Sequence, residues 1–443
     1  DLAALYDTYE RMPSEKYVSP EIMLKIMLYA YHEGKEISSR TIEKNCKRDI
    51  NYMYLLEGRQ APDHAAIARF RTKHFGKCAN LFLSQMTKIL LELKQLTKTE
   101  VFIDGTKIEA SANKYTFVWK KAVTKHQEKY LRKTALLVGD IIERYGCKPL
   151  WRKQVKKKHV KKLLKQLKIE AEKRELEFVS GRGHRKQQLQ KDIEDLEAAL
   201  QKLKEYETKL HRCGARNSYS KTDHDATFMH MKEDHMMNGQ LKPGYNIQHA
   251  VNSGFIVAAK VFPNPTDVMT LKPFMEQMEA SLQFQFARVV ADAGYESEEN
   301  LVYLRDKGIE AYIKPSNYEQ IGTKKFEKEI GRKENMQYDQ AGDYYICHNG
   351  KRVEKTGVKT RKTASGYLRE ETHYECKDCS GCLCKEKCLA GKNWKKPLEE
   401  RNKKLTVSRL FEEMREEEYR LINSEEGKKL RMNRSIQAEG GFA

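Results

Sequence analysis

Two aspartates follow short apolar stretches that are typical of β-strands. Asp104 comes directly after residues 101–103 (VFI), and Asp292 comes directly after residues 289–291 (VVA). In α/β sheets, ligands gather beyond the carboxyl ends of the strands. Two carboxylates at such an edge favour Mg²⁺, which takes oxygen ligands, and a pair of these ions can activate the attacking oxygen and stabilise the leaving oxygen of a phosphodiester. A third carboxylate usually completes the set, and Glu439 in the last helix-like stretch is the candidate.

Each of these residues also has a simpler structural interpretation. Asp104-Gly105 is a strong hairpin-turn signal when taken alone. Asp292 precedes Ala293-Gly294 and could cap the helical region that follows, and Glu439 could be an ordinary surface residue of a helix. The three signals are weak singly and gain weight only together.

The composition restricts the classes of protein. The 443 residues carry a formal net charge of +20, which indicates a polyanionic partner. The apolar runs are far too short to cross a bilayer, and no charged start followed by an apolar stretch marks a signal peptide. Membrane and secreted classes are therefore excluded. The sequence has no Walker A loop and no GxGxxG, which excludes a nucleotide cofactor, and it has no HExxH and no GxSxG.

Residues 1–95 are expected to form short helices joined by short links, as in helix-turn-helix bundles. Ser19-Pro20 and Ser38/Ser39 are helix starts, and a third start lies at residues 61–64. Basic side chains crowd the third helix, which favours contact with DNA. The candidates for this contact are Arg69 and Arg71. A dimerisation or packing domain is the alternative.

The core is expected to mix strands and helices in three pieces, residues 96–118, 215–317 and 425–443. Residues 119–214 form a first insertion. Its residues 151–168 hold nine Lys and Arg and no acid, and a leucine heptad follows from Leu189. Residues 180–183 are interpreted as the turn between two antiparallel helices. Such a hairpin either lies along a DNA backbone, through Lys156, Lys157 and Lys158, or simply presents a solvated basic face.

Residues 318–424 form a second insertion with a dense group of cysteines. Its five cysteines are Cys376, Cys379, Cys382, Cys384 and Cys388. Zinc takes four ligands, and a CxxC pair supplies two of them from one turn, so one thiol would be spare. Structural Zn²⁺, an iron–sulfur cluster and reduced unliganded thiols remain open, with His348 and His373 as further ligand candidates. In each case we expect the group to brace the insertion and to take no part in catalysis.

Several stretches of the sequence resemble the catalytic blocks of bacterial insertion-sequence DDE transposases. Residues 102–110 (FIDGTKIEA) resemble the first block, residues 290–295 (VADAGY) the second and residues 434–440 (RSIQAEG) the Glu-bearing third. Residues 220–226, residues 244–248 and the N-terminal residues 22–71 are similar to further family strings. The resemblance covers nearly the whole chain in the expected order.

The resemblance implies a ribonuclease H-like mixed-sheet core with an N-terminal helical domain and the two insertions, an α/β and α+β multidomain protein. It implies a catalytic triad of Asp104, Asp292 and Glu439 that holds two Mg²⁺, or Mn²⁺. Lys107, Tyr295 and Arg434 are candidates for touching phosphate or ordering the triad. Members of the family cut DNA at transposon ends with water, and the freed 3′-hydroxyl then attacks target DNA.

The partners implied are double-stranded DNA, as inverted repeats and target, and a second copy of the chain in a synaptic complex. The location implied is the bacterial cytoplasm, at the nucleoid. Family members continue the last helix to a basic residue about two turns past the glutamate, whereas this sequence stops at Ala443, so a fragment ending there is expected to lack that contact. Two other functions compete: an inactive or domesticated DNA-binding derivative, and a ribonuclease H-like nuclease that does not join.

Overall fold

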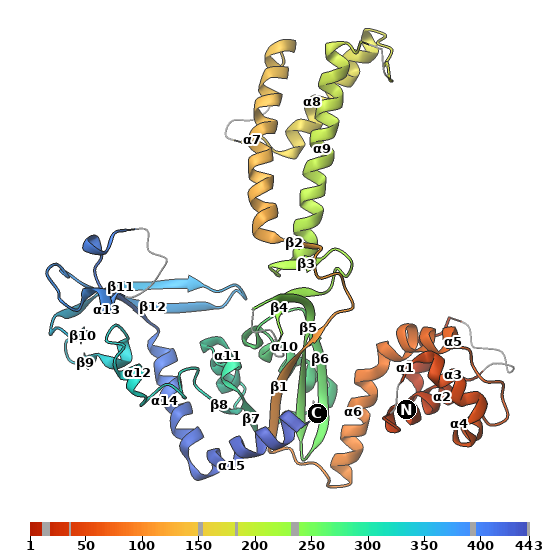
Figure 1. Cartoon of the computed structure of the whole chain (residues 1–443), viewed down its shortest axis with the longest axis vertical. Helices are drawn as coiled ribbons and strands as arrows, with labels where there is room; N and C mark the ends of the chain where they lie inside the picture. Colours follow the sequence, from red (N-terminus) through yellow and green to blue (C-terminus); the bar gives the residue numbers. More distant parts are fainter. Residues whose placement is uncertain are drawn as a thin grey trace. The chain divides into compact units, whose positions relative to one another are not determined.

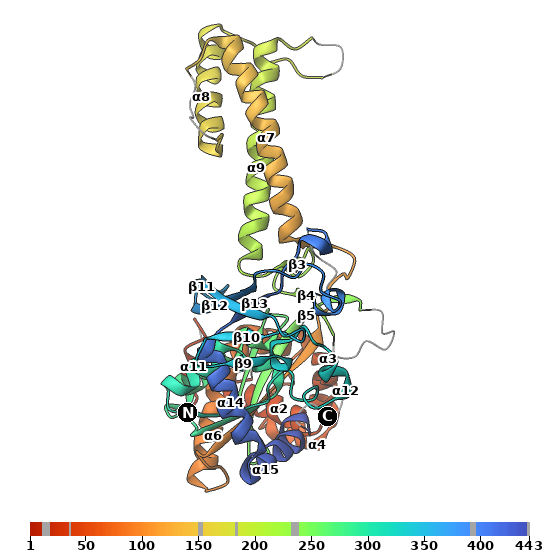
Figure 2. The same ribbon diagram turned by 90° about the vertical axis from the view of Figure 1, so that its left-hand side faces the viewer.

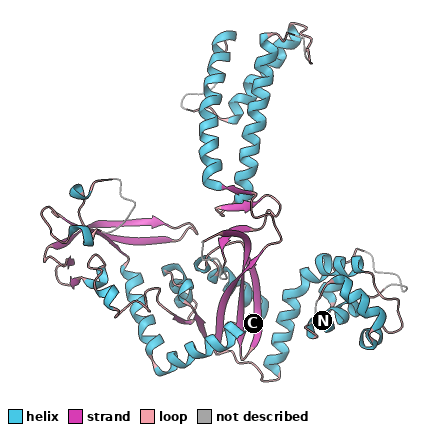
Figure 3. Cartoon of the chain, viewed as in Figure 1, coloured by secondary structure: helices cyan, strands magenta, loops and turns pink. Residues whose placement is uncertain are grey.

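The computed structural model describes residues 1–10, 18–34, 37–148, 154–181, 185–231, 239–389 and 396–440. The chain forms two compact units. Unit 1 comprises Asp1–Gly105, Gln248–Lys260 and Asp267–Ala443, and unit 2 comprises Thr106–Ile247 and Val261–Thr266. Helices and strands are mixed along the chain (Figure 3), which confirms a mixed α/β multidomain protein. The four-part division expected from the sequence stays a prediction, because the two units are cut at different places.

Unit 1 begins with a bundle of helices. These are α1 (Ala3–Tyr6), α2 (Pro20–His32), α3 (Ser39–Arg48), α4 (Ile50–Leu55), α5 (His64–Arg69), the π-helix η1 (Phe70–Phe75) and α6 (Gly76–Glu92). The three expected helix starts are confirmed, since the side chains of Ser19, Ser38 and Asp63 each accept a hydrogen bond from an amide in the first turn of α2, α3 and α5. Apolar residues from these helices, among them Ile26 and Ile67, form one buried cluster.

A six-stranded mixed sheet carries the residues of interest. Its strands are β1 (Glu100–Glu109), β4 (Thr227–His230), β5 (Leu241–Asn252), β6 (Phe255–Phe262), β7 (Arg288–Ala291) and β8 (Glu310–Ile313). The order is β4-β5-β1-β7-β8, and β6 also pairs with β5. β1 is parallel to β7, and β7 is parallel to β8. The boundary between the two units crosses β1, β5 and β6.

The expected strands agree closely with the observed ones, and one local interpretation is wrong. β1 and β7 contain the apolar stretches 101–103 and 289–291 that the sequence predicts as strands. The hairpin-turn interpretation of Asp104-Gly105 is wrong, because β1 continues through both residues to Glu109. The tight turn lies elsewhere, between β5 and β6, where Ser253 and Gly254 both have positive φ, as a two-residue hairpin turn requires.

The helices of the sheet region in unit 1 follow the short 3₁₀ turn η2 (Asp267–Met269). They are α10 (Leu271–Leu282), α11 (Glu298–Asp306), α14 (Arg409–Asn423) and α15 (Glu425–Arg434). The chain turns at η3 (Ala293–Tyr295) after β7 and ends in the π-helical turn η6 (Ser435–Glu439). α14 packs against β8 and α15 against β7, although the sequence interpretation placed α14 inside the second insertion. The Ser424 side chain caps α15, where a final helix was expected.

The cysteine-containing part of unit 1 is built on a five-stranded antiparallel sheet (Figure 1). In order, its strands are β13 (Lys404–Val407), β12 (Leu368–Cys376), β11 (Arg352–Lys362), β10 (Tyr344–Ile346) and β9 (Gln337–Asp339). Short helical elements accompany it: α12 (Lys324–Glu327), η4 (Lys333–Asn335), α13 (Lys385–Cys388) and η5 (Leu398–Glu400). Val353, Tyr374 and Cys376 are central members of its buried cluster.

Unit 2 holds the first insertion, which contains three helices where two were expected. α7 (Lys120–Tyr145) and α9 (Gln188–Cys213) pack along each other, and α8 (Lys157–Lys173) packs against α9 (Figures 1 and 2). Leu163, Leu167, Ile193 and Leu196 belong to their common buried cluster. β2 (Phe117–Trp119) and β3 (Ser218–Ser220) pair at the base of α7 and α9. The turn predicted at residues 180–183 lies mostly outside the described residues.

None of the helices in the described ranges combines the length and the apolar character needed to cross a bilayer.

Candidate functional site

The structure brings Asp104 and Asp292 to the same region of the six-stranded sheet. Asp104 lies in β1 and Asp292 directly follows β7, and these two strands are adjacent and parallel. β7 ends just before Asp292, whereas β1 continues five residues past Asp104, so Asp104 lies inside its strand next to the carboxyl end of β7. The expected strand-end position is confirmed for Asp292 and is wrong for Asp104, although the two residues do lie on neighbouring parallel strands of one sheet.

The first carboxylate is buried and faces a cation. Asp104 is 5% exposed, and its Oδ1 accepts a hydrogen bond from the Gly105 amide at 2.9 Å. The Arg434 guanidinium lies 3.8 Å from the same oxygen. Arg434 was one of the candidates for touching phosphate or ordering the triad, and its ion pair with Asp104 places it beside this carboxylate.

The second carboxylate is half-buried in a negative surrounding. Asp292 Oδ1 accepts a hydrogen bond from the Gly294 amide at 2.9 Å and caps the short turn η3. Burial raises the pKa of Asp292, and the negative charges of Asp104 and Asp267 raise it further, while the Gly294 amide and Arg434 act in the opposite direction. The capping interpretation of Asp292 is thus confirmed, and its role as a metal-binding carboxylate stays a prediction.

A further carboxylate, that of Asp267, lies beside Asp104 and Asp292. This residue was not identified from the sequence. Built on their backbones, a Cβ at Gly105 would lie 3.0 Å from Asp267 Oδ1, and a Cβ at Gly294 would lie 3.2 Å from Asp267 Oδ2. Asp267 therefore adjoins the residue after Asp104 and the turn that Asp292 caps. The signal that could have found it is the one used for the other two, since Asp267 is the first acid after the strand β6.

Two polar side chains hold this arrangement from inside. Gln248 Nε2 donates to Asp267 Oδ1 at 2.9 Å, and Gln248 Oε1 accepts a hydrogen bond from the Tyr295 hydroxyl. Both residues are fully buried, and burial raises the pKa of Tyr295 well above its ordinary value, so it stays neutral. Tyr295 thus orders the site from the protein interior, through its hydrogen bond to Gln248. Because its side chain is fully buried, the hydroxyl cannot reach a phosphate in solvent.

The last helical turn brings the backbone of Glu439 to the same region. Ala438 is buried in a cluster with Phe102 and Val290, which lie two residues before Asp104 and Asp292. The Ala438 carbonyl oxygen lies 3.1 Å from His249 Nε2. The side chain of Glu439 is outside what the structure describes, so the third member of the predicted triad stays a prediction.

The remaining predicted residues lie elsewhere. Arg69 ends α5 and Arg71 lies in η1, both in the N-terminal bundle. Lys107 is a half-buried residue of β1 and belongs to unit 2. Lys156, Lys157 and Lys158 lie at the start of α8 in unit 2, where Lys157 forms an ion pair with Glu207. No DNA contact of these residues is tested by the structure.

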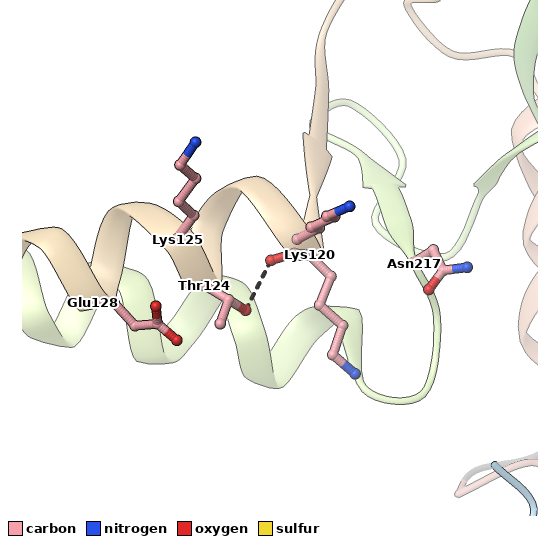
Figure 4. A pocket seen from close by; sticks show the side chains of 6 residues that line it. Lys120, Thr124, Lys125, Glu128 and Asn217 are labelled. Atoms are coloured by element: carbon pink, nitrogen blue, oxygen red, sulfur yellow. Dashed lines mark hydrogen bonds between the residues drawn. The ribbon is translucent and has the colours of Figure 1, made fainter. Parts of the chain in front are cut away.

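A basic pocket lies at the start of α7 in unit 2, and neither Asp104 nor Asp292 lines it. Its volume is about 400 Å³, and Figure 4 shows the side chains around it. It is lined by Lys120, Lys121, Thr124, Lys125, Glu128 and Asn217. Thr124 Oγ1 donates to the Lys120 carbonyl oxygen at 3.0 Å, so this hydroxyl serves the helix backbone. The pocket holds one carboxylate and cannot provide a paired-carboxylate site.

The five clustered cysteines run from the end of β12 to α13. All ten cysteines of the chain are free thiols. Cys376 is buried, and burial raises the pKa of its thiol to about 11. Cys379 and Cys347 pack against the same buried cluster as Cys376, although Cys347 lies 29 residues before Cys376 in the sequence. The described residues contain no group of three or more His, Cys, Asp or Glu side chains arranged to hold a metal ion, so structural zinc at these cysteines stays a prediction.

Comparison with known protein families gives three matches. Residues 216–383 match a family described as Transposase DDE domain, and residues 346–443 match a second family with the same description. Residues 1–73 match a family described as Transposase domain. Asp292 and Glu439 lie within matched ranges, whereas Asp104 lies between them. Neither the curated proteins nor the solved structures provide a match to the chain.

Proposed function

Because the chain belongs to the insertion-sequence DDE transposases, we propose that it binds the ends of its element and cleaves and joins DNA at Asp104, Asp292 and Glu439. The observation that carries the proposal is that Asp104 in β1 lies next to the carboxyl end of the adjacent parallel strand β7, which Asp292 directly follows. The strand order also supports a ribonuclease H-like core, since β1, β7 and β8 are parallel neighbours and the β5–β6 hairpin flanks β1.

The donor set suits Mg²⁺. Carboxylate oxygens are the ligands this ion prefers, and the raised pKa of Asp292 reflects its burial first and then the negative charges of Asp104 and Asp267. Asp104 and Asp292, with Glu439, would hold two such ions, which supply activation of the attacking oxygen and stabilisation of the leaving oxygen. The protein's own part is to fix the carboxylates before DNA arrives.

Hydrogen bonds and one ion pair from the surrounding residues fix the carboxylates in place. The Gly105 and Gly294 amides each donate a hydrogen bond to one oxygen of Asp104 and Asp292, respectively. Arg434 balances part of the charge of Asp104. Hydrogen bonds from Tyr295 to Gln248 and from Gln248 to Asp267 fix the Asp267 carboxylate beside the other two.

The overall charge of +20 suits a protein that holds two element ends and a target. We propose the N-terminal helices for recognition of the inverted repeats and a dimer for synapsis of the two ends. Binding through backbone phosphates should weaken steeply with salt, since each neutralised phosphate releases counterions.

The test is a cleavage assay on supercoiled plasmid that carries the element's own flanking DNA, run with Mg²⁺ and with EDTA. Asp292→Asn and Asp104→Asn should each lower cleavage at the element boundary by about a thousandfold or more, since several kcal/mol of transition-state stabilisation are lost. DNA binding should stay near normal. The matched control is Asp306→Asn, because Asp306 is an exposed carboxylate at the end of α11 and should leave cleavage unchanged.

The outcomes separate the competing functions. Tight binding without cuts in any metal would contradict the proposal and favour an inactive DNA-binding derivative. Metal-dependent nicks without a strand-transfer product, even with a supplied 3′-hydroxyl end, would favour a nuclease that does not join. Loss of binding in Asp292→Asn would make Asp292 a structural residue.

A further inference from the structure

Helix α8 in unit 2 has two opposite faces. Val160, Leu163 and Leu167 are buried against its neighbours. At roughly 100° per residue along an α-helix, Lys158, Lys161, Lys162 and Lys165 fall within an arc of roughly 100° on the side away from those apolar residues. The side chains of all four lysines are exposed. We call this set the lysine face.

The lysine face differs from the flanks of the same helix in its partners. Lys157 pairs with Glu207 and Lys168 with Glu197, both glutamates of α9. The four residues of the lysine face form no ion pair or side-chain hydrogen bond with any of the residues that the structure describes. The flanking lysines thus have their charge balanced within the fold, whereas the lysine face keeps four positive charges toward solvent.

No acid interrupts this charge. Between Lys156 and Ile169 the sequence has no Asp or Glu. The first carboxylate that helical spacing places on the same face is Glu172, two turns beyond Lys165, and Lys173 follows it directly. A helix face that only needs solubility usually mixes both signs of charge, as α9 does with its Glu and Lys residues.

We infer that the lysine face binds the phosphate backbone of double-stranded DNA while the protein holds its substrate. The choice of DNA rests on the proposed function, and the location rests on α8 alone. Lys158 and Lys165 are seven residues apart, about 10 Å along the helix, and duplex DNA carries one charge per about 1.7 Å of its axis. Several phosphates therefore lie within reach of the four ammonium groups, which bind phosphate as point charges without reading sequence.

The inference refines the sequence interpretation, which named Lys156, Lys157 and Lys158. Lys157 is engaged by Glu207, and Lys156 precedes the first residue of α8. Only Lys158 of these three belongs to the lysine face, and the other members lie one and two turns further along the helix.

The experiment compares two quadruple variants of the full chain with equal change in net charge. The first removes the lysine face: Lys158→Gln, Lys161→Gln, Lys162→Gln and Lys165→Gln. The second removes four lysines of the same insertion that each pair with a glutamate: Lys157→Gln, Lys168→Gln, Lys186→Gln and Lys202→Gln. Binding of a fluorescein-labelled duplex carrying the element ends is measured by anisotropy in EDTA, over ~50 to ~200 mM salt.

We expect the first variant to bind at least about tenfold more weakly at ~0.1 M salt, with the slope of log K against log salt reduced by about 3 to 4, near 0.9 for each lost contact. The second variant should keep the wild-type slope. Equal losses in both variants would overturn the inference, because net charge alone would then explain them, and so would an unchanged slope in the first variant.

Thermal unfolding followed by circular dichroism shows whether each variant is folded. If the first variant is unstable, the single changes Lys161→Gln and Lys165→Gln replace it, each with an expected slope change of about 0.9. Because the readout is binding without Mg²⁺, it is independent of cleavage. If the protein did not cleave DNA in the plasmid assay, the inference about the lysine face would still stand. If the lysine face did not bind DNA, the proposal of cleavage at the carboxylates would still stand.

Discussion

Asp104 and Asp292 stand in register across two parallel strands. β1 and β7 pair with a constant offset of 188 residues (288 − 100), from Glu100 opposite Arg288 to Phe102 opposite Val290. The same offset separates the two aspartates (292 − 104). The ladder ends at Phe102 and Val290, so each aspartate comes two residues after the last paired residue of its own segment, and the pairing of the two strands brings both acids to one region of the sheet.

The glycine after Asp104 is required by its neighbours, and its replacement should damage the site. A Cβ at Gly105 would lie 2.2 Å from Gln248 Nε2 and 3.0 Å from Asp267 Oδ1. Gly105→Ala should therefore displace both side chains, destabilise the fold by about 1–3 kcal/mol and lower cleavage strongly. Thermal unfolding and the plasmid cleavage assay measure the two effects.

The control for this change is Gly139→Ala in the middle of α7, where no atom lies within 4 Å of the new methyl group. There alanine should stabilise the helix by up to about 1 kcal/mol, because glycine is the poorer helix former. Wild-type cleavage by Gly105→Ala would contradict the close approach described for Gln248 and Asp267.

Asp267 should tune the affinity of the site for Mg²⁺. It adjoins Gly105 and Gly294 and contributes negative charge at Asp292. Asp267→Asn keeps the size of the side chain and removes this charge, so the Mg²⁺ concentration for half-maximal cleavage should rise about 10–100-fold, as for residues behind direct metal ligands. Titration of Mg²⁺ in the cleavage assay gives this value, and an unchanged midpoint would show that Asp267 is only a structural residue.

Tyr295 should act through Gln248 and not through DNA. Tyr295→Phe removes the hydroxyl that donates to Gln248 Oε1, which should cost about 1 kcal/mol of stability and lower cleavage while DNA binding stays near normal. Tyr115→Phe is the control, because Tyr115 is 74% exposed and should change neither property. If Tyr295→Phe lowered the affinity for DNA, the prediction would be wrong, because a fully buried side chain should make no contact with DNA.

Local signals in the sequence predicted much of the fold because they act over a few residues. The caps Ser19, Ser38 and Asp63 supply acceptors for first-turn amides wherever the chain goes next. The apolar runs of β6 and β7 likewise fix their own bounds. The apolar stretches before Asp104 and Asp292 also predicted two strands that the structure pairs side by side.

Contacts between distant residues explain what the sequence did not predict. Asp104-Gly105 has a local preference for a turn, yet β1 continues past its last pair with β7, because β5 pairs along its other edge and because Gln248 and Asp267 occupy the space beside Gly105. The strand β11 was missed because almost all of its residues are exposed and charged or polar, with only Val353 fully buried. Cys347 joins the surroundings of Cys376 only because β10 and β12 belong to one sheet.

Glu418 should make the stability of the protein depend on pH in an unusual direction. It is a buried residue of α14, and its Oε2 accepts a hydrogen bond from the Ile313 amide at 3.0 Å. Burial, together with the charges of Glu296 and Glu417, raises the pKa of Glu418 to about 8. Between the ordinary glutamate pKa of 4.5 and the raised pKa of about 8, the folded state keeps a proton that the unfolded state releases.

The sign of the effect follows from this difference in bound protons. Stability falls with rising pH wherever the folded state binds more protons, by at most about 1.4 kcal/mol per pH unit for one group. Glu418→Gln cannot ionise and still offers an acceptor to the Ile313 amide. The variant should therefore match the wild type near pH 5 and exceed it in stability above pH 8, as chemical unfolding over this range would measure. Glu417→Gln, which alters an exposed neighbour, should retain most of the wild-type slope, and an equal pH slope in wild type and Glu418→Gln would show that Glu418 is ionised in the folded protein.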